Sequence, residues 1–321
     1  MYIYRSQLFR LVMLLSITAA FFCMMVLSSC VHKDIEWPST THLSVEFDWE
    51  RASGAEVDGM TLYFFPADNH SKLWRFDIAG GKGGPLELPP GHYSLIAVNN
   101  DLRGVTFSGT DSYSLLQANA RPYAADTLTL STGMLYAASF PSVRVGYSGV
   151  DYTDSSGRNV TSPEGIIRAF PDSLATVYHI RIDSVSGAER IRSARAVLCG
   201  VAASVAISSC ANSSASCAAD FAIPLTGSAS STTLTTSEAA FGVPDIPTPQ
   251  FTLRIVVTTA HAVYEKNFDV TGQVLNSGNN RNVYIHISGI NIPAADPPSG
   301  DPDVGINVGV DGWQVIEITY S

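Results

Sequence analysis

The chain has 321 residues, with 19 Lys and Arg against 29 Asp and Glu, and a formal net charge of −10 at pH 7. An acidic chain with so few basic residues lacks the charge pattern of a nucleic-acid-binding protein. It also has no polybasic patch that could hold it on an anionic membrane surface.

The first thirty residues have the features of a bacterial lipoprotein leader. Two arginines precede an apolar run at residues 11–27, which ends in Leu27-Ser28-Ser29-Cys30. Lipoprotein processing requires an aliphatic residue three positions before the cysteine, small residues at the cut, and the thiol itself. We therefore expect a signal peptide at residues 1–29 and acyl chains on Cys30, which would anchor the chain stably. A transmembrane helix is disfavoured because polar residues interrupt the run and no positively charged cluster follows it.

Most of the remaining chain alternates apolar and polar residues with the period of a half-buried β-strand. Residues 30–41 are polar and predict a tether, and two domains are expected after it, at 42–165 and 166–321. We predict an all-β fold because almost no segment has helical periodicity. The strands expected in chain order are 42–49, 59–66, 72–79, 86–88, 93–98, 174–184, 251–259, 262–270, 282–290 and 314–321.

The segment LELPPGHYSLIAVNN at residues 86–100 contains a strand, a turn and a second strand. Pro90 and Gly91 predict a type II turn, because proline fixes φ at the second turn position and glycine supplies the positive φ of the third. Apolar residues then line both faces of the strand at 93–98. A strand that is apolar on both faces is expected at the centre of its sheet.

Three features of the pattern are less well defined. The many Gly, Ser, Asp and Tyr residues at 104–165 predict a loose segment that contains the domain boundary. The Ala-, Ser- and Thr-rich segment 193–240 fits either tightly packed strands or a long surface excursion. Cys199, Cys210 and Cys217 are odd in number, so one thiol stays free whether or not Cys210 and Cys217 form a disulfide.

No arrangement of residues predicts catalysis, a metal site or a cofactor. Gly146-Tyr147-Ser148-Gly149 resembles the start of a nucleophile elbow, but Val150 replaces the last glycine, which favours a loop. His179 and His286 lie in expected strands, where a solvated face is a simpler interpretation than a ligand. The acidic residues of the proline-rich loop 291–305 lack the spacing of a calcium-binding loop.

Seven short motifs occur in order over nearly the whole mature chain. They are HKD, FDW, MTLYFFP, PPGHYSLIAVNND, FPDSL, FDVTGQV and VDGWQVIEITY. Together they resemble an uncharacterised family of Bacteroidetes lipoproteins that is related to fimbrillin and fimbrial anchor subunits. The resemblance implies two transthyretin-like (Greek-key) β-sandwich domains, a lipid on Cys30, attachment to the outer membrane and a role in or near surface fimbriae. Lys33, Asp34 and Glu36 are similar to the charged signal that sends such lipoproteins to the cell surface.

The same resemblance implies that the protein meets its partners by strand pairing, in which an open sheet edge takes main-chain hydrogen bonds from another chain. The strand-pairing candidates are Gln314, Val315, Ile316, Glu317, Ile318, Thr319 and Tyr320. The alternative is that this last strand only closes its own domain. Shaft subunits of such fimbriae are trimmed by an arginine-specific protease, and Arg51 is the arginine nearest the expected place. A chain left uncut there keeps its lipid, which favours an anchor.

We therefore expect a protein of the cell outer membrane that is lipid-anchored, is not an enzyme, and has fimbrial or other surface subunits as partners. The alternative hypothesis is a glycan-binding lipoprotein of a polysaccharide uptake system. It depends on Trp37 and Trp74, which could stack on a sugar if exposed. Trp49 and Trp313 are expected in the core.

Overall fold

The computed structural model describes residues 40–68, 72–123, 128–154, 156–225, 233–278, 281–293 and 312–318. All of them belong to one compact unit, Thr40–Ser321. Within these ranges the protein is nearly all β, with one α-helix, α2 (Thr271–Leu275), and two 3-10 helices, η1 (Glu50–Ala52) and η2 (Ala188–Arg190). The prediction of an all-β fold is confirmed.

Strands β1 to β23 make up the described part of the fold. Those up to residue 173 are β1 (Thr41–Phe47), β2 (Gly59–Pro66), β3 (Trp74–Ala79), β4 (Gly83–Leu88), β5 (Gly91–Asn99), β6 (Val105–Ser108), β7 (Gln117–Ala120), β8 (Leu128–Leu130), β9 (Tyr136–Gly146), β10 (Gly149–Thr153), β11 (Asn159–Ser162), β12 (Ile166–Ala169) and β13 (Asp172–Ser173). Those after it are β14 (Thr176–Asp183), β15 (Ser193–Ala202), β16 (Ser204–Ala206), β17 (Ala211–Asn212), β18 (Ser216–Ile223), β19 (Leu234–Ala240), β20 (Thr252–Thr258), β21 (Ala262–Asp269), β22 (Asn282–Ser288) and β23 (Gln314–Ile318).

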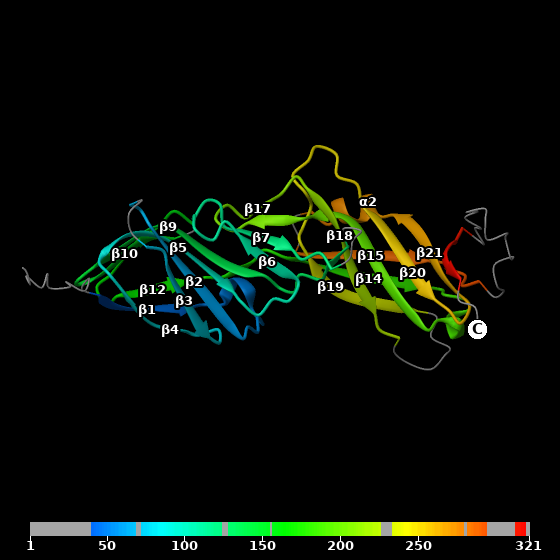
Figure 1. Ribbon diagram of the computed structural model, residues 1–321, viewed down its shortest axis with the longest axis horizontal. Helices are drawn as coiled ribbons and strands as arrows, with labels where there is room; N and C mark the ends of the chain where they lie inside the picture. The colour runs from blue at the N-terminus through cyan, green and yellow to red at the C-terminus, as the bar shows by residue number, and fades with distance from the viewer. Residues whose placement is uncertain are drawn as a thin grey trace, which may run out of the picture. The chain divides into compact units, whose positions relative to one another are not determined.

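Two sheets enclose an N-terminal core (Figure 1). One has the strand order β12-β1-β4, and the other has the order β11-β10-β9-β5-β2-β3, with β13 paired to β9. Leu43, Val45 and Phe47 alternate inward along β1, as predicted for a half-buried strand. The N-terminal core includes Val45, Met60, Leu62, Phe64, Leu95, Phe140, Val143 and Ile167.

Strand β5 is buried on both faces and lies between β2 and β9, which confirms its predicted central position. Leu95 faces the N-terminal core, whereas Ile96 faces a second, middle core. The middle core draws residues from both halves of the chain and includes Tyr63, Phe65, Ile96, Val98, Leu116, Leu135, Val205, Ile207 and Phe241. Because a fully buried Leu or Ile side chain contributes about 1.5–3 kcal/mol, β5 stabilises two cores at once.

The predicted type II turn before β5 is wrong. Gly91 does not have a positive φ. It already belongs to β5, where it pairs with Val145. Strand β4 pairs with β1 in the other sheet, so the chain at Pro89 and Pro90 crosses from one sheet to the other instead of folding back into a hairpin. Local turn residues could not show this, because the partner of β4 lies about forty residues away.

The segment 104–165 is not loose, because it contains strands β6 to β11. Its small residues pack closely: Ala118 and Ala120 of β7 are buried in or beside the middle core. Strand β7 pairs with β16, and β8 pairs with β18, so this segment is hydrogen-bonded to the second half of the chain. The domain boundary at residue 165 stays a prediction.

The described residues of the segment 193–240, which leave out 226–232, form packed strands, as the first of its two alternatives predicted. Ala196 and Ala202 of β15 and Ala219 of β18 are almost fully buried. Small side chains allow the backbones of neighbouring layers to approach closely. Between Cys199 and Val201 the β15–β18 register shifts by a bulge at Gly200, whose φ of +100° favours glycine.

A C-terminal core lies between two further sheets, with strand orders β19-β14-β22 and β23-β21-β20-β15-β18-β8. The hairpin predicted near Ala260 and His261 is confirmed, since β20 and β21 pair antiparallel. Strands β14 and β22 pair in parallel although about a hundred residues separate them. The C-terminal core includes Tyr178, Ile180, Leu198, Phe221, Phe251, Leu253, Tyr264, Ile285 and Trp313.

Candidate functional site

The last described strand, β23, lies at the edge of the six-stranded sheet, where it pairs antiparallel with β21. In Figure 1 it is the red strand beside β21. Glu265 faces Gln314 and Tyr264 faces Val315, and the register then shifts, so Ile316 has no partner in the pairing. The Ile316 side chain is 49% exposed. An edge strand with an exposed apolar residue is a ready template for pairing with another chain.

The start of β23 is anchored by Trp313, whose side chain is fully buried in the C-terminal core. Its indole N–H donates a 2.7 Å hydrogen bond to the carbonyl oxygen of Asn291. The ammonium group of Lys266 lies 5.9 Å from the centre of the indole ring, a distance at which a cation is attracted to an aromatic face. The edge strand is therefore fixed at one end by packing and along its length by β21.

Some predicted site residues lie outside the described part of the chain. These are Cys30, Thr319 and Tyr320. Glu317 and Ile318 are placed by their backbone pairing with Val263 and Ala262. The structure therefore brings Gln314 to Ile318 together as one edge strand, while the lipid site stays a prediction.

At two of the other sheet edges, side chains form hydrogen bonds with the backbone groups that an added strand would need. At β12, the amide N–H groups of Ile166 and Arg168 donate to Ser162 Oγ at 3.0 Å and to the Tyr152 hydroxyl at 3.2 Å. These N–H groups would otherwise be free to pair with an added strand. Hydroxyl oxygens now satisfy them, which makes strand addition at β12 costly.

At the edge of β22, the side-chain amide of Gln273 occupies a strand position. Its Oε1 accepts a 2.7 Å hydrogen bond from the backbone N–H of His286, and its Nε2 donates a 3.2 Å bond to the backbone oxygen of the same residue. An amide that both accepts and donates in this way imitates one peptide group of a pairing strand. Sequence reasoning did not assign this role to Gln273, although the residue lies in the motif FDVTGQV.

The residues considered for other chemistry have structural roles. The nitrogen atoms of His179 contact Ser237 Oγ at 2.9 Å and Asn282 Oδ1 at 3.0 Å, and His286 is paired with Asp183 at 2.8 Å. Gly146 and Gly149 close the β9–β10 hairpin, so the predicted loop is confirmed. Among the described residues no group of three or more His, Cys, Asp and Glu could hold a metal ion.

The cysteines and tryptophans also have defined environments. Cys199, Cys210 and Cys217 are all free thiols. Trp74 is half-buried against the N-terminal core and stacks on Phe76 with ring centres 6.5 Å apart, so it packs rather than forming an exposed platform. Trp37 lies outside the described residues. No helix in the described part of the chain has the length and apolar character needed to span a membrane.

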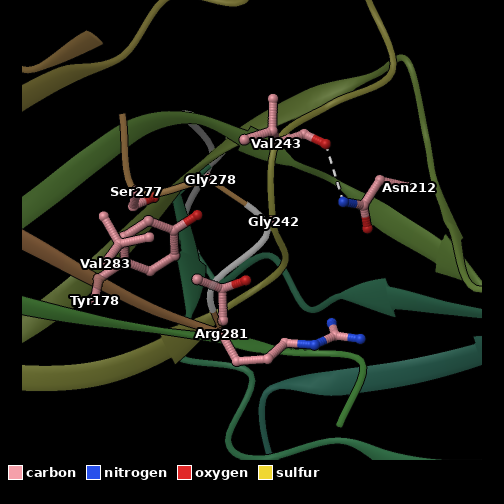
Figure 2. A pocket seen from close by; sticks show the side chains of 9 residues that line it. Tyr178, Asn212, Gly242, Val243, Ser277, Gly278, Arg281 and Val283 are labelled. Carbon is pink, nitrogen blue, oxygen red and sulfur yellow. Dashed lines mark hydrogen bonds between the residues drawn. The ribbon is translucent and has the colours of Figure 1, made fainter. Parts of the chain in front are cut away.

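A pocket of about 420 Å³ opens where β14 and β22 begin (Figure 2). Its lining consists of Thr176, Tyr178, Asn212, Gly242, Val243, Ser277, Gly278, Arg281 and Val283. In Figure 2 the guanidinium of Arg281 and the amide of Asn212 extend away from the Tyr178 ring. Arg281 is the one charged residue among the described residues of this lining. No local pattern in the sequence signals this site, because its residues come from five separate segments.

Residues 29–222, more than half of the chain, match the model of a family described as Domain of unknown function (DUF5119). The chain belongs to this family. It is also 24% identical, over 98 residues, to a candidate fimbrium anchoring subunit, Fim4B, of Bacteroides ovatus. That match spans 30% of this chain and 28% of the relative, so most of the relative's length is not covered.

One of the solved structures with which the chain was compared shows a similar fold. The crystal structure of a candidate adhesin from Bacteroides ovatus superposes with a TM-score of 0.59 at 16% identity, covering 83% of this chain and 98% of that one. The fimbrial anchor protein Mfa2 of Porphyromonas gingivalis gives a TM-score of 0.49 at 12% identity, over 78% of this chain and 90% of that one. The predicted resemblance to an uncharacterised family with fimbrial anchor relatives is confirmed.

Proposed function

We propose that the protein is a lipid-anchored subunit on the outer membrane that binds fimbrial subunits by β-strand pairing. In this proposal residues 1–29 are removed, Cys30 carries the lipid, and residues 30–41 tether the folded part to the membrane. Support comes from the lipobox in the sequence and from the relative named as a fimbrium anchoring subunit. The role is structural and involves no catalytic step.

We also propose two transthyretin-like (Greek-key) domains, at 42–165 and 166–321, as the framework for this role. The supporting observation is the separation of the two outer cores: the N-terminal core draws on residues from Leu43 to Ala169, and the C-terminal core on residues from Tyr178 to Trp313. The middle core between them contains residues of both halves. It would stiffen the chain between its tether and its partner.

The observation that carries the proposal is the edge position of β23. Within the described residues no strand lies beyond it in the six-stranded sheet. Its backbone pairs with β21 on one side, and Ile316 is exposed. In the proposed mode β23 stays in its own sheet and presents its outer side to a partner strand, whose backbone hydrogen bonds supply the affinity.

The anchor role requires that the chain is not cut after Arg51. This residue lies in η1, the next element after β1, and its guanidinium is 5.5 Å from the ring centre of Phe170. Strand β1 is hydrogen-bonded to both β12 and β4. We propose that the intact chain keeps β1 and the lipid joined to the rest of the protein.

Deletion of residues 314–321 tests this function. Trp313 remains in the truncated chain, so the C-terminal core keeps its anchor. The expected result is loss of co-purification with fimbrial subunits while the protein stays folded and in the membrane fraction. Persistent co-purification would contradict the proposal, and loss of all folded protein would favour a strand that only closes its own domain.

A point substitution gives a milder test of the same edge. Ile316→Lys should weaken the association, because a charge on an edge strand opposes pairing with another strand. Leu115→Lys is the matched control, since Leu115 is 65% exposed and lies far from β23 in the sequence. Equal effects of the two substitutions would contradict a specific role for the edge of β23.

A further inference from the structure

The pocket in Figure 2 contains a positive charge that the described part of the protein does not use. The side chain of Arg281 forms no hydrogen bond or ion pair with the described residues. The backbone oxygen of Arg281 accepts a 2.8 Å hydrogen bond from the backbone N–H of Val177. Burial raises the pKa of the nearby Cys210 thiol, an effect that Arg281 opposes and Asp172 adds to. No ion pair joins Asp172 to Arg281.

The floor of the pocket is kept open by a glycine. A Cβ atom at Gly242 would lie 3.0 Å from Asn212 Nδ2 and 3.4 Å from Thr176 Oγ1. Its φ is not positive, so backbone conformation does not require glycine at this position. The missing side chain leaves the amide of Asn212 and the hydroxyl of Thr176 accessible from the pocket.

Two of the polar side chains are already held in place. The Asn212 amide donates a 2.9 Å hydrogen bond to the carbonyl oxygen of Val243, which leaves its second N–H and its oxygen for a ligand. The Tyr178 hydroxyl donates a 3.1 Å hydrogen bond to the carbonyl oxygen of Phe241, and Tyr178 is 0% exposed, so its ring forms a fixed part of the pocket wall. Groups fixed before binding lose less conformational entropy when a ligand arrives.

We propose that this pocket binds an acidic sugar, with its carboxylate on Arg281 and its hydroxyl groups on Asn212 and Thr176. A guanidinium matches a carboxylate through two parallel hydrogen bonds. Amide and hydroxyl groups suit the sugar hydroxyls, which both donate and accept. The volume of about 420 Å³ lies within the range of small-molecule sites and accommodates a uronic acid unit of a polysaccharide. The proposal does not depend on strand pairing at β23.

Titration of the full chain with galacturonic acid, galactose and acetate at pH 7, followed by calorimetry or ligand-observed NMR, tests the proposal. Galacturonic acid should bind roughly two- to fivefold more tightly than galactose, because an ion pair with the exposed side chain of Arg281 contributes about that much. Acetate should bind at least about tenfold more weakly than galacturonic acid, since it lacks the hydroxyl groups.

Three variants assign the interaction to the pocket. Arg281→Gln should reduce galacturonic acid binding to the level of galactose, and Arg281→Lys should retain part of it. Gly242→Ala should weaken the binding of both sugars, because the added methyl group occupies space at the floor of the pocket. Arg192→Gln is the matched control, because Arg192 is an exposed arginine outside the pocket, and it should change nothing.

Four results would overturn the proposal. They are equal binding of galactose and galacturonic acid, equal binding of acetate and galacturonic acid, an unchanged affinity in Arg281→Gln, and no binding of galacturonic acid at about 10 mM. Equal acetate binding would indicate a general carboxylate site, such as one for a peptide terminus. None of these readouts involves fimbrial subunits, so failure here is distinguishable from failure of the proposed function.

Discussion

The indole N–H of Trp313 donates a 2.7 Å hydrogen bond to the carbonyl oxygen of Asn291, and the indole ring is fully buried. This bond joins the segment before β23 to the segment that follows β22. It fixes the position at which the terminal strand leaves the C-terminal core. The edge strand is therefore held by the packed Trp313 directly before its first residue, Gln314.

Substitution of Trp313 by Phe should destabilise the protein, because it removes the indole donor and leaves both a cavity and an unsatisfied carbonyl oxygen. We expect a loss of about 1–3 kcal/mol for the unsatisfied oxygen, with a further cost for the cavity. Chemical unfolding followed by circular dichroism measures the change. Trp74→Phe is the control, since Trp74 is only half-buried, and a comparable loss there would contradict the anchoring role of Trp313.

Truncating a buried side chain on either face of β5 should lower the free energy of unfolding by a similar amount. Leu95 and Ile96 are each 0% exposed but lie in different cores. Leu95→Ala and Ile96→Ala should each cost about 2–5 kcal/mol. The exposed Leu115→Ala should change stability by less than about 0.5 kcal/mol. A small effect of either core substitution in urea unfolding would show that the corresponding face is not packed.

Stability should depend on pH through Asp183. Hydrogen bonds from Arg181, His286 and Thr233 hold the pKa of this carboxyl well below its usual range. A carboxylate with a lowered pKa stabilises the folded state above its unfolded pKa, near 3.9, and this stabilisation is lost as pH falls toward the folded pKa. Asp183→Asn should therefore lower the unfolding midpoint most above about pH 5. The difference from the unaltered protein should shrink below about pH 4.

A control and a contradicting outcome accompany this pH series. Asp245→Asn is the control, because Asp245 is an exposed aspartate outside this hydrogen-bonded group and its replacement leaves the bonds to Asp183 in place. A constant difference for Asp183→Asn between pH 3 and pH 7 would show that its hydrogen bonds do not favour the charged carboxylate.

Replacement of Cys30 by Ala should move the protein from the membrane fraction to the soluble fraction of the cell. The reason is that acyl chains on this thiol are the proposed anchor. Immunoblotting of the two fractions measures the change, with Cys210→Ala as the control for loss of a thiol elsewhere. Tight membrane retention of the Cys30→Ala protein would indicate instead that the leader remains as a membrane span.

Local sequence patterns were sufficient to place many strands. The expected strand at 59–66 coincides with β2 (Gly59–Pro66), and the hairpin of β20 and β21 followed from two apolar runs around Ala260 and His261. Both depend on the alternation of apolar residues, which is a property of the strand itself. The apolar character of both faces of β5 likewise predicted its central position.

Pairing between distant segments could not be predicted in the same way. Strand β4 pairs with β1 and not with β5, and β14 pairs in parallel with β22. Which strands pair depends on the burial of whole sheet faces. The sequence of a single segment therefore does not identify its partner strand. The pocket around Arg281 is another example, because its lining residues Thr176, Asn212 and Gly242 come from separate segments of the chain.

Photo-crosslinking from position 316 in living cells is the sharpest test of strand pairing at β23. A crosslinking amino acid in place of Ile316 would lie on the exposed side of this edge strand, and the same amino acid at Leu115 serves as the control. Strand pairing predicts a covalent product with a fimbrial subunit from position 316 and none from position 115. A cell that assembles fimbriae but yields no such product from position 316 would show that β23 does not pair with a fimbrial partner.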